Sequence, residues 1–222
     1  MARSIKNVKN VINKYDTIIF DFDGTLINSE PAHNLGHKIM LETLLGYEIP
    51  DFESFVDSYI GKKDSIIFEE FKEIFHLTCD TSTMFDLKRK AVLDILLNNP
   101  HSMNKYIEDM FAAKGNKRYY ILSNNHKSFV DEVLEKKGYS KYIDAIFCME
   151  DMSLTKDVFL DNVSSYIKGG VDKDTLLICE DSVPFIKYLV ENGYNVLSVE
   201  HRYNKGQVSN AKYIIKDGFI GE

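Results

Sequence analysis

Cysteine is scarce in this sequence. Cys79, Cys148 and Cys179 are the only three among 222 residues, and they are far apart. So few and so scattered thiols exclude a disulfide framework and a cysteine-based zinc site. Cys148 and Cys179 each end an apolar run, which indicates buried, reduced thiols in strands. A reducing, cytoplasmic location fits that composition.

The chain also lacks an excess of positive charge and any long apolar run. A formal net charge of -7 argues against a nucleic-acid backbone as the partner. No stretch reaches the roughly 20 apolar residues that cross a bilayer, so we expect no membrane span. The first 15 residues have no continuous apolar segment of a secretory signal; Ile5, Val8, Val11 and Ile12 are instead spaced as in a short helix packed on the domain. Oligomeric state cannot be predicted.

What the chain does have is an alternation of short apolar runs and helical patterns. The runs predict strands at 17–22, 118–123, 144–149, 175–182, 195–199 and 212–216. Helical spacing follows three of them, at 126–139, 155–168 and 183–194. Strands that are apolar on both faces and alternate with helices predict an α/β fold, in which a Rossmann-like parallel sheet carries helices on both faces.

The stretch between the first two strands has a different pattern. Residues 31–112 show helical periodicity and little strand signal, with Pro50 and Pro100 as breaks. We therefore predict two domains: an α/β core formed by residues 1–28 and 101–222, and an inserted helical domain at 29–100.

Polar residues collect where the predicted strands end. Asp21 and Asp23 follow the first strand within "IIFDFDGTLINSE", Ser123 and Asn124 follow the second, and Glu180 and Asp181 end the fourth, while Lys156 begins the helix after the third. Ligands of parallel sheets bind beyond the carboxyl ends of the strands, so we expect these groups to meet there. Buried carboxylates are costly unless they are paired or bound to a metal.

This set of groups suits phosphoryl transfer. Asp21, Asp23 and Asp181 offer the hard oxygen ligands that Mg²⁺ prefers. Ser123, Lys156 and nearby backbone N–H groups could hold a phosphoryl group, and positioning and charge neutralisation are most of what the reaction needs. One ionised carboxylate could attack phosphorus, and a second could pass the proton.

The motifs "DFDGTL", "ILSNN" and "ICEDS", in this order, resemble those of the haloacid dehalogenase superfamily, and the insertion resembles its helical C1 cap. The resemblance implies that Asp21 is the nucleophile and Asp23 the general acid/base. Ser123 and Asn124 would contact the phosphoryl group. Asp181 would bind Mg²⁺, with Glu180 as a ligand or a partner of one, and the Asp23 carbonyl would complete the protein ligands.

Three further assignments depend on this resemblance. Lys156 stands in "SLTKDVFL" without the Lys-Pro that relatives carry, so it is either the phosphate-facing lysine or a solvated residue at a helix start. His33 is either a substrate contact or a polar residue in the first turn of a helix that Pro31 begins. Lys62, in "GKKDS", could meet an anionic group of the substrate, although a lysine pair is more often a solvated turn.

The sequence thus predicts a Mg²⁺-dependent enzyme that hydrolyses a small phosphorylated metabolite, such as a sugar phosphate, through an aspartyl-phosphate. Phosphotransfer of the β-phosphoglucomutase type is the alternative. Thr25 favours the phosphatase, because mutases often have an aliphatic residue at this position. A non-catalytic binding module is a third hypothesis, which the intact Asp21, Asp23 and Asp181 oppose.

Overall fold

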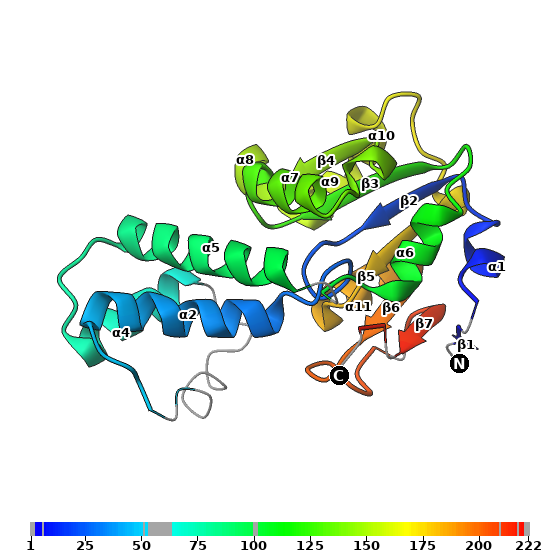
Figure 1. Ribbon diagram of the computed structural model, residues 1–222. Coiled ribbons are helices and arrows are strands. Elements are labelled where there is room, and N and C mark those ends of the chain that lie inside the picture. The colour runs from blue at the N-terminus through cyan, green and yellow to red at the C-terminus, as the bar shows by residue number, and fades with distance from the viewer. Residues whose placement is uncertain are drawn as a thin grey trace. The chain divides into compact units, whose positions relative to one another are not determined.

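A computed structural model describes residues 3–5, 7–50, 52, 64–99, 102–208, 210–216 and 218–219. The chain divides into two compact units, Met1–Asn28 with Pro100–Glu222, and Ser29–Asn99. The first unit holds the sheet, and the second holds helices (Figure 1). That the second unit acts as a cap domain remains a prediction.

The first unit is built on a parallel sheet of seven strands, counted over the described residues, in the order β1-β7-β6-β5-β2-β3-β4. The strands are β1 (Arg3–Ser4), β2 (Thr17–Phe20), β3 (Arg118–Ser123), β4 (Ala145–Cys148), β5 (Leu176–Glu180), β6 (Asn195–Glu200) and β7 (Tyr213–Lys216). Helices lie on both faces of the sheet (Figure 1), which confirms the predicted fold class.

Strand β2 lies inside the sheet, and its four residues are all buried. Alternate side chains of a strand point to opposite faces. Ile19 joins a core with Phe159 and Ile186. Phe20 packs edge-on against Phe111 and against the neighbouring strand. This two-sided burial fixes the place where the chain leaves the sheet after Phe20.

The helices of the first unit are α1 (Lys9–Ile12), α6 (Lys105–Ala112), α7 (Lys127–Lys136), α8 (Met149–Met152), α9 (Lys156–Asp161), α10 (Val163–Tyr166) and α11 (Val183–Glu191), with 3-10 turns η2 (Ser140–Tyr142) and η3 (Lys173–Thr175). The single helix expected at 155–168 is wrong, because Asn162 leaves helical geometry between α9 and α10. At the N-terminus the predicted helix is confined to Lys9–Ile12. Residues Arg3–Ser4 instead form strand β1, which pairs with β7. The sequence pattern did not predict β1.

The second unit contains α2 (Glu30–Leu45), α4 (Asp64–Phe75) and α5 (Thr81–Asn98). Pro31 stands in the first turn of α2, and Gly46, with a φ of 75°, ends it in the left-handed conformation. Asp80 caps α5 by accepting a hydrogen bond from the Thr83 N–H at 2.7 Å. The unit has its own apolar core, which includes Met40, Phe68 and Phe71 among its buried residues. Within the described part of the chain, no helix combines the length and the apolar character that crossing a membrane requires.

Candidate active site

Two carboxylates leave the sheet side by side. Strand pairing aligns Phe20 of β2 with Cys179 of β5, so the next residues are Asp21 and Glu180. The Asp21 N–H donates to the Cys179 carbonyl at 2.9 Å, which holds the backbone of Asp21 at the strand end. With Asp181, which follows directly, Asp21 and Glu180 each offer a carboxylate oxygen within 4.8 Å of the others. The sequence predicted that these groups would meet here.

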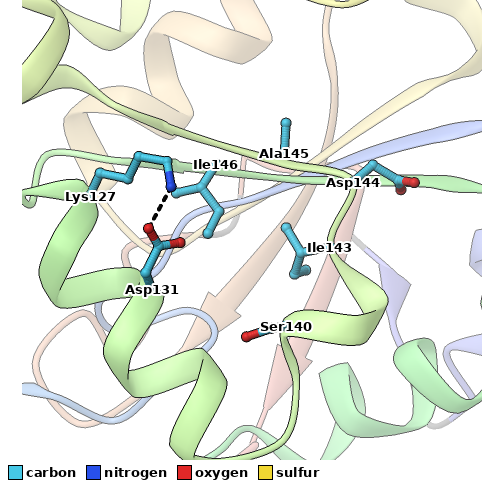
Figure 2. A pocket seen from close by; sticks show the side chains of 7 residues that line it. All are labelled: Lys127, Asp131, Ser140, Ile143, Asp144, Ala145 and Ile146. Atoms are coloured by element: carbon cyan, nitrogen blue, oxygen red, sulfur yellow. Dashed lines mark hydrogen bonds and ion pairs between the residues drawn. The ribbon is translucent and has the colours of Figure 1, made fainter.

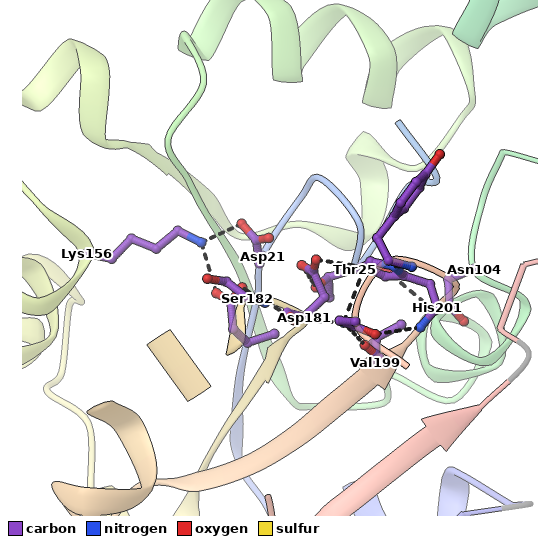
Figure 3. A network of polar contacts seen from close by, with 11 residues as sticks. Asp21, Thr25, Asn104, Lys156, Asp181, Ser182, Val199 and His201 are labelled. Carbon is purple, nitrogen blue, oxygen red and sulfur yellow. Dashed lines mark hydrogen bonds and ion pairs between the residues drawn. The ribbon is translucent and has the colours of Figure 1, made fainter. Parts of the chain in front are cut away.

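Lys156, the first residue of α9, binds two of these carboxylates. Its Nζ lies 2.6 Å from Asp21 Oδ1 (Figure 3). The same Nζ lies 2.9 Å from Glu180 Oε2. Lys156 is 9% exposed, Asp21 7% and Glu180 1%. The alternative of a solvated lysine is therefore wrong. That Lys156 contacts a phosphoryl group remains a prediction.

Burial and charge act on these three groups together. Burial raises the pKa of Asp21, the negative charge of Glu180 raises it further, and Lys156 opposes both effects. Burial likewise raises the pKa of Glu180. Burial alone would lower the pKa of Lys156, but Asp21 and Glu180 together raise it, so the lysine stays protonated. One buried cation thus contacts two of the three clustered carboxyl groups, and further positive charge would stabilise the cluster.

Glu180 also organises the start of α11. Its Oε1 accepts hydrogen bonds from the N–H groups of Asp181 at 3.1 Å and Ser182 at 2.9 Å. Because Oε2 binds Lys156, both oxygens of Glu180 have partners. Glu180 therefore positions Lys156 and the backbone of Asp181. This positioning does not depend on whether Glu180 also binds a metal.

Asp23 lies in the loop that follows β2. The loop closes on itself, because the N–H of Gly24 donates to the carbonyl of Ile27 at 2.8 Å. The Asn125 side-chain amide donates to Asp23 Oδ2. Asp23 is not in the carboxylate cluster found among the described residues, which contains Glu180 instead. The side chain of Asp23 is thus held by an amide rather than grouped with those three carboxylates, and its role in proton transfer remains a prediction.

Asp181 is held by three residues that were not predicted as site residues. Thr25 Oγ1 donates to Oδ1 at 2.9 Å, and His201 Nε2 lies 2.9 Å from Oδ2. Asn204 donates its side-chain amide to the backbone carbonyl of Asp181 at 2.8 Å. His201 and Asn204 follow β6, and their turn could have been found from its Asn and Gly residues, but not its contact with Asp181.

The remaining predicted residues are distributed as follows. Ser123 ends β3 fully buried, and its Oγ accepts a hydrogen bond from the Asn125 N–H at 3.1 Å. Asn124, beside it, is exposed. His33 lies in the first turns of α2, in the second unit, where its N–H donates to the Ser29 carbonyl at 2.8 Å. Lys62 lies outside the described residues.

The donor set fits a small, hard cation. Asp21, Glu180 and Asp181 supply only oxygen, which is what Mg²⁺ binds in proteins. A Cβ on Gly24 would stand 2.4 Å from Asp181 Oδ2, so the loop leaves room for that carboxylate only because residue 24 is glycine. Asp21, Glu180 and Asp181 are therefore the described residues whose carboxylates fit such a cation.

A pocket elsewhere in the same unit does not share this chemistry. It has a volume of about 320 Å³ and lies at the amino end of β4, against α7 (Figure 2). The Lys127 ammonium on its rim is paired with Asp131. Asp144 binds Lys114 and accepts from the Tyr119 N–H. Its charges thus have partners within the protein, and the opposite end of the strands carries the candidate site.

Comparisons with solved structures agree on the fold. A candidate beta-phosphoglucomutase from Thermotoga maritima superposes with a TM-score of 0.72 at 15% identity, covering 90% of this chain and 94% of that one. The candidate HAD-hydrolase YfnB from Bacillus subtilis, bound to magnesium, gives 0.71 at 16% identity, with coverage of 90% and 94%. CbbY from Rhodobacter sphaeroides, in complex with phosphate, gives 0.70 at 16% identity, with coverage of 90% and 93%.

The family itself is established by sequence. Residues 18–187, most of the chain, match the family model described as haloacid dehalogenase-like hydrolase. This range contains Asp21, the Ser123 segment, Lys156 and the Glu180–Asp181 pair. The match confirms the resemblance seen in the three motifs, and it makes the chain an enzyme of the hydrolase class. The chain belongs to the haloacid dehalogenase-like hydrolase family.

Proposed function

We propose that this chain is a Mg²⁺-dependent phosphatase that hydrolyses a small phosphate monoester, such as a sugar phosphate, through an aspartyl-phosphate on Asp21. The observation that carries the proposal is the buried Asp21 carboxylate, bound by Lys156 and grouped with Glu180 and Asp181 at the carboxyl edge of the sheet. The family is one of hydrolases, and CbbY, which has the same fold, was solved with phosphate.

In the first half of the reaction, an Asp21 oxygen forms a bond to phosphorus as the ester P–O bond breaks. The leaving oxygen takes a proton from Asp23, whose carboxyl group Asn125 orients. In the second half, Asp23 takes a proton from water as the water attacks phosphorus, which releases phosphate and restores Asp21. Lys156 and Ser123 would hold the phosphoryl oxygens. Bound Mg²⁺ would supply positive charge to the substrate phosphate and to Asp21.

The nucleophile assignment is tested by Asp21→Asn. An amide cannot form the aspartyl-phosphate, so we expect turnover of phosphate esters to fall by on the order of 10³-fold or more. The measurement is phosphate release across a panel of phosphorylated metabolites with Mg²⁺ present. Asp16→Asn, an exposed aspartate at the other end of β2, is the matched control and should keep full activity. Activity retained by Asp21→Asn would exclude Asp21 as the nucleophile.

The metal is tested by removing and restoring it. EDTA should stop turnover, and excess Mg²⁺ should restore it, because three carboxylates and a phosphate ester repel one another without a divalent cation. Activity that is indifferent to chelation would contradict the metal requirement.

The second candidate is intramolecular phosphotransfer of the β-phosphoglucomutase type, which the likeness to the Thermotoga maritima structure favours. The same residues would act, but the aspartyl-phosphate would return its phosphoryl group to the sugar. That Thr25 favours the phosphatase stays a prediction; its hydroxyl donates a hydrogen bond to Asp181. An isomerisation assay primed with a sugar bisphosphate, run beside the phosphate-release assay, distinguishes them: a mutase isomerises faster than it releases phosphate.

A further inference from the structure

We propose that His201 is a positioning residue for the metal site, which holds the Asp181 carboxylate in the orientation that binds Mg²⁺. This inference rests on the proposed function, because it assigns a role to His201 only if Asp181 is a metal ligand. The family model ends at residue 187, so His201 lies outside the matched range.

The first observation is that donors reach both oxygens of one carboxylate. His201 Nε2 is 2.9 Å from Asp181 Oδ2, and Thr25 Oγ1 is 2.9 Å from Oδ1 (Figure 3). Two bonds at opposite oxygens fix the rotation of the carboxylate about its terminal bond. Each carboxylate oxygen has two lone pairs, so each keeps one for a cation. Outer partners of this kind orient metal ligands and raise metal affinity.

The second observation decides which ring nitrogen of His201 carries the hydrogen. The backbone N–H of Tyr203 donates to His201 Nδ1 at 3.3 Å. Nδ1 must then be an acceptor, so the hydrogen of the neutral ring is on Nε2, where it points at Asp181. The turn therefore selects the tautomer that donates to the carboxylate.

The third observation is that Asn204 ties this turn both to Asp181 and to β6. Its amide donates to the carbonyl of Asp181 at 2.8 Å and to that of Val199 at 3.0 Å, and its Oδ1 accepts from the His201 N–H at 2.9 Å. Both amide hydrogens are used, so the 3.3 Å approach of Asn204 Nδ2 to His201 Nε2 leaves the Nε2 hydrogen for Asp181. Asn204 is 5% exposed and fixes the turn from inside. The hydrogen bonds of the turn thus fix the position of His201.

The test measures Mg²⁺ affinity by calorimetry on the full chain, without substrate. We expect His201→Asn, which is too short to reach Oδ2, to weaken Mg²⁺ binding about 10- to 100-fold. His201→Gln, which returns an N–H donor near the Nε2 position, should stay within about threefold of the wild type. Gln207→Ala, an exposed neutral residue of the same turn, is the matched control and should leave the affinity unchanged.

Thermal unfolding of the same proteins separates positioning from structure. If His201→Asn loses stability but binds Mg²⁺ as the wild type does, the role is structural and the inference is overturned. If Gln weakens binding as much as Asn, the donated hydrogen bond is not the cause, and the inference also fails. Nitrogen-15 NMR of the ring should show a protonated Nε2 and a bare Nδ1, and the opposite tautomer would contradict the hydrogen bond on which the inference depends.

Asp181→Asn distinguishes failure of this inference from failure of the proposed function. If Asp181→Asn abolishes Mg²⁺ binding while the His201 variants retain it, only the positioning role fails. If Asp181→Asn binds Mg²⁺ as tightly as the wild type, the metal site itself is wrong and both proposals fall.

Discussion

Gly24 illustrates how a single residue decides whether a carboxylate fits in this site. Its φ of 71° is in the left-handed region, which residues with a Cβ rarely adopt. The absence of a Cβ also leaves room for the Asp181 carboxylate, since a Cβ would lie 2.4 Å from Oδ2. Backbone conformation and site geometry thus require glycine independently, and substitutions can separate the two requirements.

We expect Gly24→Ala to cost about 1–3 kcal/mol of unfolding free energy through backbone strain, and also to weaken Mg²⁺ binding by displacing Asp181. Gly193→Ala is the matched control, because Gly193 has a φ of 74° but nothing within 4 Å of the added Cβ. Both variants should melt a few degrees lower, at about 2–4 °C per kcal/mol for a chain of this size. Only Gly24→Ala should lose Mg²⁺ affinity in calorimetry. If the two variants lose Mg²⁺ affinity equally, or if neither loses it, the clash with Asp181 is contradicted.

The two aspartates of "DFDG" show the limit of local pattern. The sequence predicts a polar pair at the end of a buried strand, and the structure has the strand end at Phe20. The pattern cannot say that Asp21 meets Lys156 while Asp23 meets Asn125, because both partners come from more than 100 residues away. A side chain's chemistry can be read locally, whereas its partners depend on the register of neighbouring strands.

At the scale of elements, the same distinction separates correct from missed predictions. Strands such as β2 and β5 were predictable because both of their faces are buried, so their residues are continuously apolar. Strand β1 was missed because Arg3–Ser4 is polar and exposed, and only its pairing with β7 makes it a strand. The break at Asn162 has a similar origin, since apolar spacing continues through it and gives no stop signal.

The helical unit also contains an ion cluster that periodicity could not predict. Lys88 of α5, with its side chain 6% exposed, binds both oxygens of Asp64, at 2.5 Å and 2.6 Å. Asp64 also lies 3.2 Å from His37 Nε2 of α2. The cluster therefore joins all three described helices of the unit. The pKa of the Asp64 carboxyl group is lowered, because its bonds to His37 and Lys88 outweigh the effect of burial.

At the scale of the whole molecule, the two units have separate cores, and the charged groups inside them respond differently to acid. In the α/β unit, the buried carboxyl groups of Asp21 and Glu180 have raised pKa values, so the folded state takes up their protons more readily than the unfolded chain does. In the helical unit the opposite holds for His37, because burial between the rings of Phe68 and Phe71 lowers its pKa. Moderate acid should therefore lower the stability of the helical unit.

The sign for His37 follows from proton linkage. Between its ordinary pKa of 6.5 and the lower folded value, the unfolded chain binds a proton that the folded chain does not. The contribution of His37 to the free energy of unfolding is complete above about pH 6.5 and is lost as the pH falls toward the folded pKa. This free energy changes by at most about 1.4 kcal/mol per pH unit through His37. Asp64, with its lowered pKa, adds its own loss only below about pH 4.

Urea unfolding at about pH 7.5 and about pH 5.5 measures this difference. His37→Gln keeps a donor for Asp64 but cannot titrate, so it should lose less stability between the two pH values than the wild type does. His76→Asn replaces an exposed histidine of the same unit, at a φ of 52° that asparagine tolerates, and should follow the wild type. Changes at Asp21 and Glu180 are common to all three proteins and cancel in the comparison. If His37→Gln is as acid-sensitive as the wild type, the buried histidine is not the source of the loss.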